Sequence, residues 1–186
     1  MKLLFATGNR NKLNEAREIL NDFDIEQFDI DLPEHQGDAG YIVSEKAKFA
    51  FKRIKKPLFV EDTSFEFNAL NGFPGPYIKD LVTRNDIGKI PKILNAFKDK
   101  SAQGISLIAF IEDENNPILF KGRIEGKVVE SRGESGFAWD SIFEPTGFNK
   151  TFAEMNTEKK NQISHRMKAF LQFRKYLKNK YMIHQP

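Results

Sequence analysis

The first twenty residues, MKLLFATGNRNKLNEAREIL (Met1–Leu20), contain the pattern that decides the fold class. The apolar run Leu3–Ala6 has the length of a buried strand, and it ends in the polar loop TGNRNK at Thr7–Lys12. Apolar residues then recur at helical spacing, which predicts a helix over Lys12–Leu20. A strand, a polar loop and a helix in this order form the opening of an α/β unit.

The rest of the chain continues to alternate strands and helices. A helix is predicted around Ala47–Ile54, and one long helix carrying both Lys160 and Tyr181 is predicted to end the chain. At 186 residues the chain is expected to form a single domain over residues 1–186, either undivided or folded as two lobes. The expected fold is α/β with a mixed sheet and flanking helices. Further strands are predicted at Ile25–Ile30, Leu58–Val60, Ile105–Glu112 and Ile118–Val129.

Composition excludes several classes of protein. A total of 29 basic and 26 acidic residues gives a net charge of +3, too balanced for a surface that coats nucleic acid. The chain has no cysteine, which excludes disulfides and thiolate chemistry, and its 3 histidines lack the spacing of zinc ligands. No apolar stretch approaches the ~18 residues of a membrane span. We therefore expect a cytoplasmic protein without a membrane or nucleic-acid partner.

The TGNRNK loop has the residue types of an anion-binding turn. Backbone amides around Gly8 and the N-terminus of the following helix favour negative charge. Thr7 and Asn9 can donate side-chain hydrogen bonds, and Lys12 can reach a phosphate oxygen. The loop does not match the P-loop pattern, so an ordinary strand-to-helix turn is the alternative.

Two carboxylates, Glu61 and Asp62, follow the apolar run Leu58–Val60. Carboxylates at the end of a buried strand point toward the crevice in which open α/β sheets bind ligands. Mg²⁺ prefers hard oxygen ligands, and Glu34 in the loop LPEHQG could complete such a site. The alternative is that Glu61 and Asp62 cap a turn.

Two later segments carry aromatic and cationic side chains. FAWD, at Phe137–Asp140, offers rings that can stack on a base and a carboxylate that can accept from ring N–H groups. Lys160 and Arg166 are predicted to flank the apolar stripe of the last helix, whereas His165 points away from it. Core aromatics and a solvated helix face are the respective alternatives.

These segments together resemble the inosine triphosphate pyrophosphatase family, and their EDTS form is similar to its eukaryotic-type branch. The resemblance covers nearly the whole chain in the family's order. The matching motifs are TGNRNK (Thr7–Lys12), LPEHQG (Leu32–Gly37), EDTSFEFNALNGFPGPYIK (Glu61–Lys79), GFAWDSIFEPTGFNKTFAEM (Gly136–Met155) and EKKNQISHRMKAF (Glu158–Phe170).

The resemblance implies Mg²⁺-dependent hydrolysis of ITP, dITP or XTP to the monophosphate and pyrophosphate, by a homodimer whose elongated sheet and two lobes surround a nucleotide cleft. It implies Glu34 and Asp62 as metal ligands, with Asp62 also the base for the attacking water. Ribose and phosphates are implied to bind at Thr7, Gly8, Asn9, Arg10, Asn11, Lys12, Lys46, Thr63 and Lys79. The purine is implied to bind at Phe137, Ala138, Trp139, Asp140, Lys160, His165 and Arg166.

One departure concerns Ala138, which stands where the family often has glycine. If that position needs a positive φ, alanine is strained there. Three other functions compete: a related pyrophosphatase for modified or pyrimidine triphosphates, a nucleic-acid-binding module, and a silent nucleotide sensor. The balanced charge and the carboxylates Glu34, Glu61 and Asp62 disfavour the nucleic-acid module, because they would repel a phosphate backbone.

Overall fold

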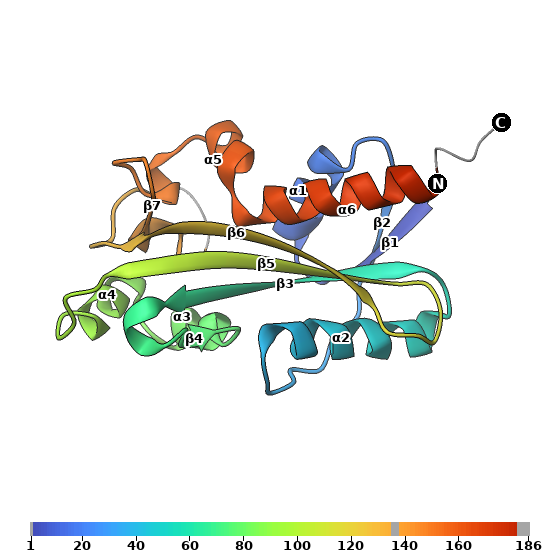
Figure 1. Cartoon of the computed structure of the whole chain (residues 1–186), viewed down its shortest axis with the longest axis horizontal. Coiled ribbons are helices and arrows are strands. Elements are labelled where there is room, and N and C mark those ends of the chain that lie inside the picture. The colour runs from blue at the N-terminus through green and yellow to red at the C-terminus, as the bar shows by residue number, and fades with distance from the viewer. Residues whose placement is uncertain (1, 135–137, 182–186) are drawn as a thin grey trace. The chain divides into compact units, whose positions relative to one another are not determined.

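The computed structural model describes residues 2–134 and 138–181 of the chain (Figure 1). Its strands form a seven-stranded mixed sheet in the order β2-β1-β3-β5-β6-β7, with β4 paired to β3. The strands are β1 (Lys2–Ala6), β2 (Asp24–Phe28), β3 (Leu58–Phe67), β4 (Pro74–Gly75), β5 (Ser101–Ile111), β6 (Ile118–Val128) and β7 (Phe143–Pro145). The predicted α/β class with a mixed sheet is confirmed.

Six α-helices and several short 3₁₀ turns connect these strands within the described residues. The helices are α1 (Arg10–Ile19), α2 (Ala39–Ile54), α3 (Ile78–Arg84), α4 (Ile90–Ile93), α5 (Thr157–Ile163) and α6 (His165–Tyr181). The 3₁₀ turns are η1 (Asn68–Leu70), η2 (Ile87–Lys89), η3 (Asp140–Ile142) and η4 (Phe152–Glu154). Among the described residues, no helix has both the length and the apolar character that a membrane span requires.

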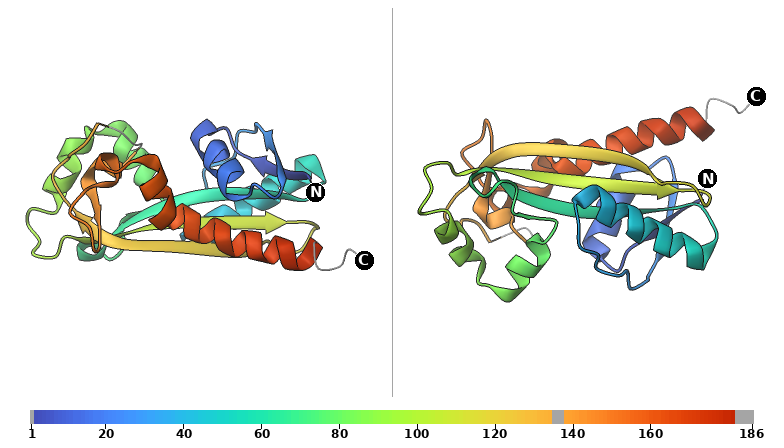
Figure 2. Two further views of the ribbon diagram at one scale, coloured as in Figure 1. Left: turned by 90° about the horizontal axis from the view of Figure 1, so that it is seen from above. Right: turned by 60° about the horizontal axis from the view of Figure 1, so that its bottom comes forward.

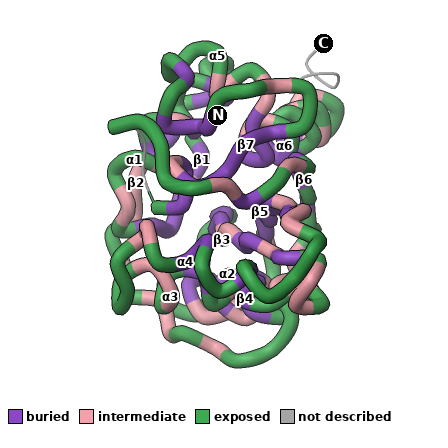
Figure 3. The backbone as a smooth tube through the Cα atoms, turned by 90° about the vertical axis from the view of Figure 1, so that its left-hand side faces the viewer, coloured by how far each residue is buried: buried purple, intermediate pink, exposed green. Residues whose placement is uncertain are grey.

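The described chain divides into two compact units, each with its own hydrophobic core. Unit 1 comprises residues 2–62, 106–122 and 166–181, and unit 2 comprises residues 63–105, 123–134 and 138–165. The boundaries fall within the long strands β3, β5 and β6 and after His165, the first residue of α6. The burial of these strands follows their sequences: β5 is buried along almost its whole length, whereas β6 alternates between exposed and buried positions. Figure 3 colours the backbone of the described residues by burial.

In unit 1, helices cover both faces of the strands. α1 and α6 lie on one face and α2 lies on the other (Figures 1 and 2). β1 pairs in parallel with β2 and β3, so Phe5 stacks on Phe59 with ring centroids 4.3 Å apart. Phe170 and Phe173 of α6 pack against the Phe59 ring at 6.0 and 5.1 Å. This aromatic core fixes α6, and with it the residues at the start of that helix.

The core of unit 2 is also aromatic. Trp139 stacks on Phe65 of β3 with centroids 4.2 Å apart and planes 2° from parallel. Gly126 pairs with Pro145 across the antiparallel β6–β7 ladder. A Cβ at Gly126 would lie 2.3 Å from the Glu144 carbonyl oxygen, so this glycine permits close packing in a regular ladder.

Two predicted elements need correction. β3 continues past Val60 to Phe67, so Glu61 and Asp62 lie within a strand and not at its end. The C-terminal helix is broken at Ser164, whose extended backbone separates α5 from α6. Serine is a preferred residue before the first turn of a helix, and this local signal was overlooked.

Candidate functional site

The TGNRNK loop is the turn between β1 and α1. Asn9 caps α1: its Oδ1 accepts from the backbone N–H of Asn11 at 2.9 Å and of Lys12 at 3.2 Å. Thr7 Oγ1 accepts from the Asn9 N–H at 3.1 Å. Because these amides already have acceptors inside the loop, an anion here would depend mainly on side chains such as that of Lys12. Gly8 and the exposed Arg10 complete the loop in unit 1.

A buried charge network joins this loop to β3 and α6. Glu61 of β3 is fully buried, and its Oε2 lies 2.8 Å from Lys12 Nζ. Its Oε1 lies 3.3 Å from Arg166 Nε and accepts from Ser106 Oγ at 2.7 Å. Arg166 also contacts Glu15 of α1, with Nη1 2.8 Å from Oε2. Two residues implied in substrate binding, Lys12 and Arg166, are thus held by one carboxylate.

The network keeps its members charged despite burial. Burial alone would raise the pKa of Glu61, but the charges of Arg166 and Lys12 outweigh it and hold this pKa well below its ordinary value. Burial would likewise lower the pKa of Arg166, but Glu61 and Glu15 hold it above its ordinary value. The structure therefore maintains a charged arginine and a charged glutamate inside unit 1.

The predicted metal ligands come together on a single ammonium group. Lys46, in the middle of α2, places Nζ 2.8 Å from Glu34 Oε2 and 2.8 Å from Asp62 Oδ2. The two carboxylate oxygens are therefore no further apart than twice that distance. Burial would lower the pKa of Lys46, but the charges of Asp62 and Glu34 outweigh it and raise this pKa.

This donor set fits a hard cation. Two carboxylates that converge on one positive group supply the ligands that Mg²⁺ commonly takes from a protein, while phosphates and water supply the rest. Across residues 2–134 and 138–181, no group of three or more acidic, histidine or cysteine side chains could hold a metal ion. A cation at Glu34 and Asp62 would consequently depend on substrate oxygens as well.

The residues implied in purine binding lie mostly in unit 2 and are largely buried. Trp139 and His165 are 3% and 4% exposed, with ring centroids 5.2 Å apart. The prediction that His165 points away from the apolar side of its helix is wrong, because the helix begins at His165 and packs this residue into the aromatic core. Asp140 is ion-paired with Lys160 of α5 at 2.6 Å.

The remaining predicted residues are distributed over both units. Ala138 has φ 57°, the left-handed conformation that makes alanine strained where the family often has glycine. Thr63 lies on β3 and Lys79 in the first turn of α3, both in unit 2. Phe137 lies outside the described residues. Apart from it, the predicted residues of unit 1 are Thr7, Gly8, Asn9, Arg10, Asn11, Lys12, Glu34, Lys46, Asp62 and Arg166, and those of unit 2 are Thr63, Lys79, Ala138, Trp139, Asp140, Lys160 and His165.

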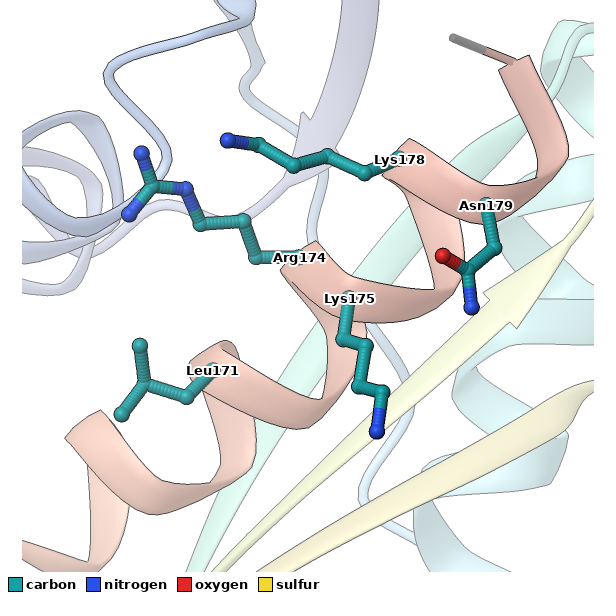
Figure 4. A pocket seen from close by; sticks show the side chains of 5 residues that line it. All are labelled: Leu171, Arg174, Lys175, Lys178 and Asn179. Carbon is teal, nitrogen blue, oxygen red and sulfur yellow. The ribbon is translucent and has the colours of Figure 1, made fainter. Parts of the chain in front are cut away.

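A surface depression of about 260 Å³ on α6 contains none of these residues (Figure 4). Its lining residues are Leu171, Arg174, Lys175, Lys178 and Asn179. Arg174 and Lys178 point to the same side, where both are ion-paired with Asp22 (Figure 4). Their role is explained by this surface pairing, so the depression is not the candidate site.

Sequence reasoning missed three members of the buried network: Glu61 as an anchor, Glu15 and Ser106. Glu15 follows Lys12 by three residues on α1, which places the two on neighbouring positions of one helix face. That spacing could have predicted that Glu15 lies beside Lys12 in the site. The contacts of Glu61 with Lys12 and Arg166 span 49 and 105 residues of sequence, and no local pattern records them.

Gly104 of β5 leaves room for the aromatic side chains of the candidate purine site. A Cβ there would lie 2.6 Å from Trp139 Cη2 and 3.4 Å from His165 Nδ1. Gly104→Ala should therefore displace the indole and lower the free energy of unfolding by about 1–3 kcal/mol. Urea unfolding measures the stability, and because the chain has 1 tryptophan, its fluorescence reports on Trp139 alone.

Gly88→Ala is the matched control for this substitution. Its new Cβ would come no closer than 3.5 Å to the Asp86 carboxylate, an ordinary contact. We expect a change within about 0.5 kcal/mol and an unaltered emission maximum. A Gly104→Ala protein with wild-type stability and emission would show that the indole packing tolerates the extra methyl group.

The fold and these residues define an α/β protein whose buried cations and converging carboxylates suit a metal-bound, phosphorylated ligand. Comparison with known proteins then identifies the family: the model of the Ham1 family matches residues 3–176, and the chain belongs to this family. The family and its curated relatives identify the chain as an enzyme, a hydrolase.

The similar proteins include fungal enzymes. An inosine triphosphate pyrophosphatase of Batrachochytrium dendrobatidis is 42% identical over 180 residues, covering 96% of this chain and 95% of the relative. The enzyme of the same name from Schizosaccharomyces pombe is 41% identical over 179 residues, covering 95% of each. Among solved structures, the Ham1 protein of Coxiella burnetii has a TM-score of 0.88 at 30% identity, covering 96% of this chain and 99% of that one.

Proposed function

We propose that this enzyme hydrolyses ITP, dITP and XTP to the nucleoside monophosphate and pyrophosphate with Mg²⁺, and thereby removes deaminated purines from the nucleotide pool. The observation that carries the proposal is the convergence of Glu34 and Asp62 on Lys46 Nζ, in a chain that also buries Arg166 and keeps Lys12 partly buried beside Glu61. The relatives named inosine triphosphate pyrophosphatase support ITP as a substrate. The nucleoside-triphosphatase, or dITP/XTP pyrophosphatase, of Mycobacterium abscessus supports the other two. Its solved structure has a TM-score of 0.74 at 26% identity, covering 93% of this chain and 98% of that one.

Glu34 and Asp62 would hold the Mg²⁺ ion. When bound, the ion supplies charge that stabilises the triphosphate and polarises the phosphorus to be attacked. Asp62 accepts the proton of the water that attacks the α-phosphorus, and the bond to the pyrophosphate group breaks. Lys12 and Lys46 neutralise the negative charge of the leaving pyrophosphate, with Thr7, Asn9, Thr63 and Lys79 holding ribose and phosphate oxygens. The reaction consumes one water and yields IMP and pyrophosphate from ITP.

Discrimination among bases follows from the donors that face the purine. Arg166, ion-paired with Glu61 and Glu15, donates toward a 6-keto oxygen together with His165. A 6-amino group would oppose these donors, and a site built to donate rejects a ligand that cannot accept. Asp140 accepts from ring N–H groups of the purine, with Trp139 beside it. We also propose that the enzyme acts in the cytoplasm as a homodimer.

Product analysis tests the reaction. With Mg²⁺, purified protein should convert ITP to IMP and pyrophosphate and leave ATP nearly untouched, with kcat/KM for ATP at least about 100-fold lower. EDTA should abolish turnover, and added Mg²⁺ should restore it. Monophosphate and pyrophosphate are assayed separately by chromatography.

The possible outcomes separate the alternatives. Formation of IDP and orthophosphate would mean that another bond is cut and that the role of Asp62 is wrong. Turnover of a pyrimidine or modified triphosphate in place of ITP would favour the related pyrophosphatase. Salt-sensitive RNA or DNA binding without turnover would favour the nucleic-acid module, whereas ITP binding without turnover would indicate a sensor.

A further inference from the structure

Glu61 contacts two residues of the proposed mechanism, Lys12 and Arg166, but takes no direct part in the reaction itself. Each oxygen of its carboxylate contacts a different cation: Oε2 lies 2.8 Å from Lys12 Nζ, and Oε1 lies 3.3 Å from Arg166 Nε. Lys12 Nζ also donates to the Glu61 backbone oxygen at 3.0 Å. All three residues belong to unit 1 and come from β3, α1 and α6.

The surroundings of Glu61 make this arrangement rigid. Its side chain is fully buried on a central strand, and Ser106 of the neighbouring strand β5 donates to Oε1 at 2.7 Å. The Arg166 side chain is 4% exposed and the Lys12 side chain 14%. A long cationic side chain loses little conformational entropy on binding a ligand when a charged partner already holds it in place.

We propose that Glu61 is a positioning residue that holds Lys12 and Arg166 at a fixed mutual distance, so that one carboxylate sets the distance between the proposed phosphate contact and the proposed purine contact. This assignment rests on the proposed function. It predicts that Glu61 affects substrate affinity and base discrimination together, although the proposed mechanism assigns Glu61 no contact of its own with the nucleotide.

Both the charge and the length of the side chain are needed for this role. Glutamine at position 61 keeps the shape but removes the negative charge that buried cations require. Aspartate keeps the charge but shortens the side chain by one methylene, roughly 1.5 Å, and so cannot reach both cations from the same strand position.

The test compares Glu61→Gln and Glu61→Asp with Ser106→Ala, a matched control that removes a hydrogen bond to the same oxygen and leaves all three charges. For each protein we would measure kcat and KM for ITP, the ratio of kcat/KM for ITP over ATP, and the modification rate of Lys12 by an amine-selective reagent. Glu61→Gln should raise KM about 10-fold and lower the ITP-over-ATP ratio about 10-fold, because both cations lose a charged partner. Lys12 should be modified several-fold faster, and Ser106→Ala should change each quantity less than about threefold.

A purely structural Glu61 gives a different result. The melting temperature of Glu61→Gln would then fall while KM, the ITP-over-ATP ratio and the Lys12 rate stayed at wild-type values, and this result would overturn the proposal. If Glu61→Gln does not fold, Glu61→Asp must show the same joint change in KM and ratio, or the proposal is wrong. Absence of ITP turnover by the wild type would refute the proposed function, and an unchanged Lys12 rate in the variants would separately refute the positioning of Lys12.

Discussion

Asp62→Asn should lower kcat for ITP by about a thousandfold, within the range that a general base contributes. The reason is that one substitution removes two proposed contributions, the proton acceptor for water and one of two carboxylates that hold the cation. Asp62 Oδ2 lies 2.8 Å from Lys46 Nζ, and its side chain is 24% exposed. Because the side chain is not in the core, folding should survive. Steady-state release of pyrophosphate measures kcat, and circular dichroism verifies the fold.

Asp38→Asn is the control for this substitution, since it makes the same chemical change in the same unit. Asp38 caps α2 by accepting from the Tyr41 N–H at 2.9 Å, and asparagine caps helices about as well as aspartate. Its kcat should therefore stay at the wild-type value. If Asp62→Asn kept a tenth of the wild-type kcat, neither proposed role of Asp62 could be correct.

The fold was predictable because its signals are local. The apolar run Leu3–Ala6, the polar loop after it and the helical repeat up to Leu20 correspond closely to β1, the turn and α1. The long strands predicted at Ile105–Glu112 and Ile118–Val129 likewise correspond to β5 and β6.

The errors occur where distant residues decide the structure. Two adjacent carboxylates resemble the end of a strand, yet Glu61 is stabilised inside β3 by Lys12 and Arg166, which no local pattern brings to it. The same contacts bury Arg166, which the helical pattern predicts beside the apolar stripe of the last helix and not inside the core. By contrast, Glu34, Lys46 and Asp62 were all predicted for the site, and the structure brings them together. Their role in binding metal and substrate stays a prediction.

Arg166→Ala should remove most of the preference for ITP over ATP, by a factor of about 100, if Arg166 donates to the 6-keto oxygen. It should also lower the free energy of unfolding by about 3–5 kcal/mol at pH 7, because Glu61 and Glu15 lose their shared cation. The substrate effect is measured as the ratio of kcat/KM values at a temperature at which the variant is folded. Full discrimination by the folded variant would show that another group reads the base.

The pH dependence of stability identifies the cause of this loss. In the wild type the pKa of Glu61 is held below its ordinary value of 4.5, so its ionisation stabilises the fold above pH 4.5, and this contribution is lost as the pH falls. Removal of Arg166 takes away a charge that lowers the pKa of Glu61, so this pKa rises and ionisation of Glu61 stabilises the fold less than in the wild type. The stability difference between the two proteins should therefore be largest near pH 7 and shrink below pH 4.5. Arg174 lies on the same helix as Arg166 but at the surface. Arg174→Ala, which removes an ion pair with Asp22 and a hydrogen bond to Asn21 Oδ1, should cost less than about 1 kcal/mol. A difference for Arg166→Ala that stays constant with pH would indicate lost packing in place of lost charge pairing.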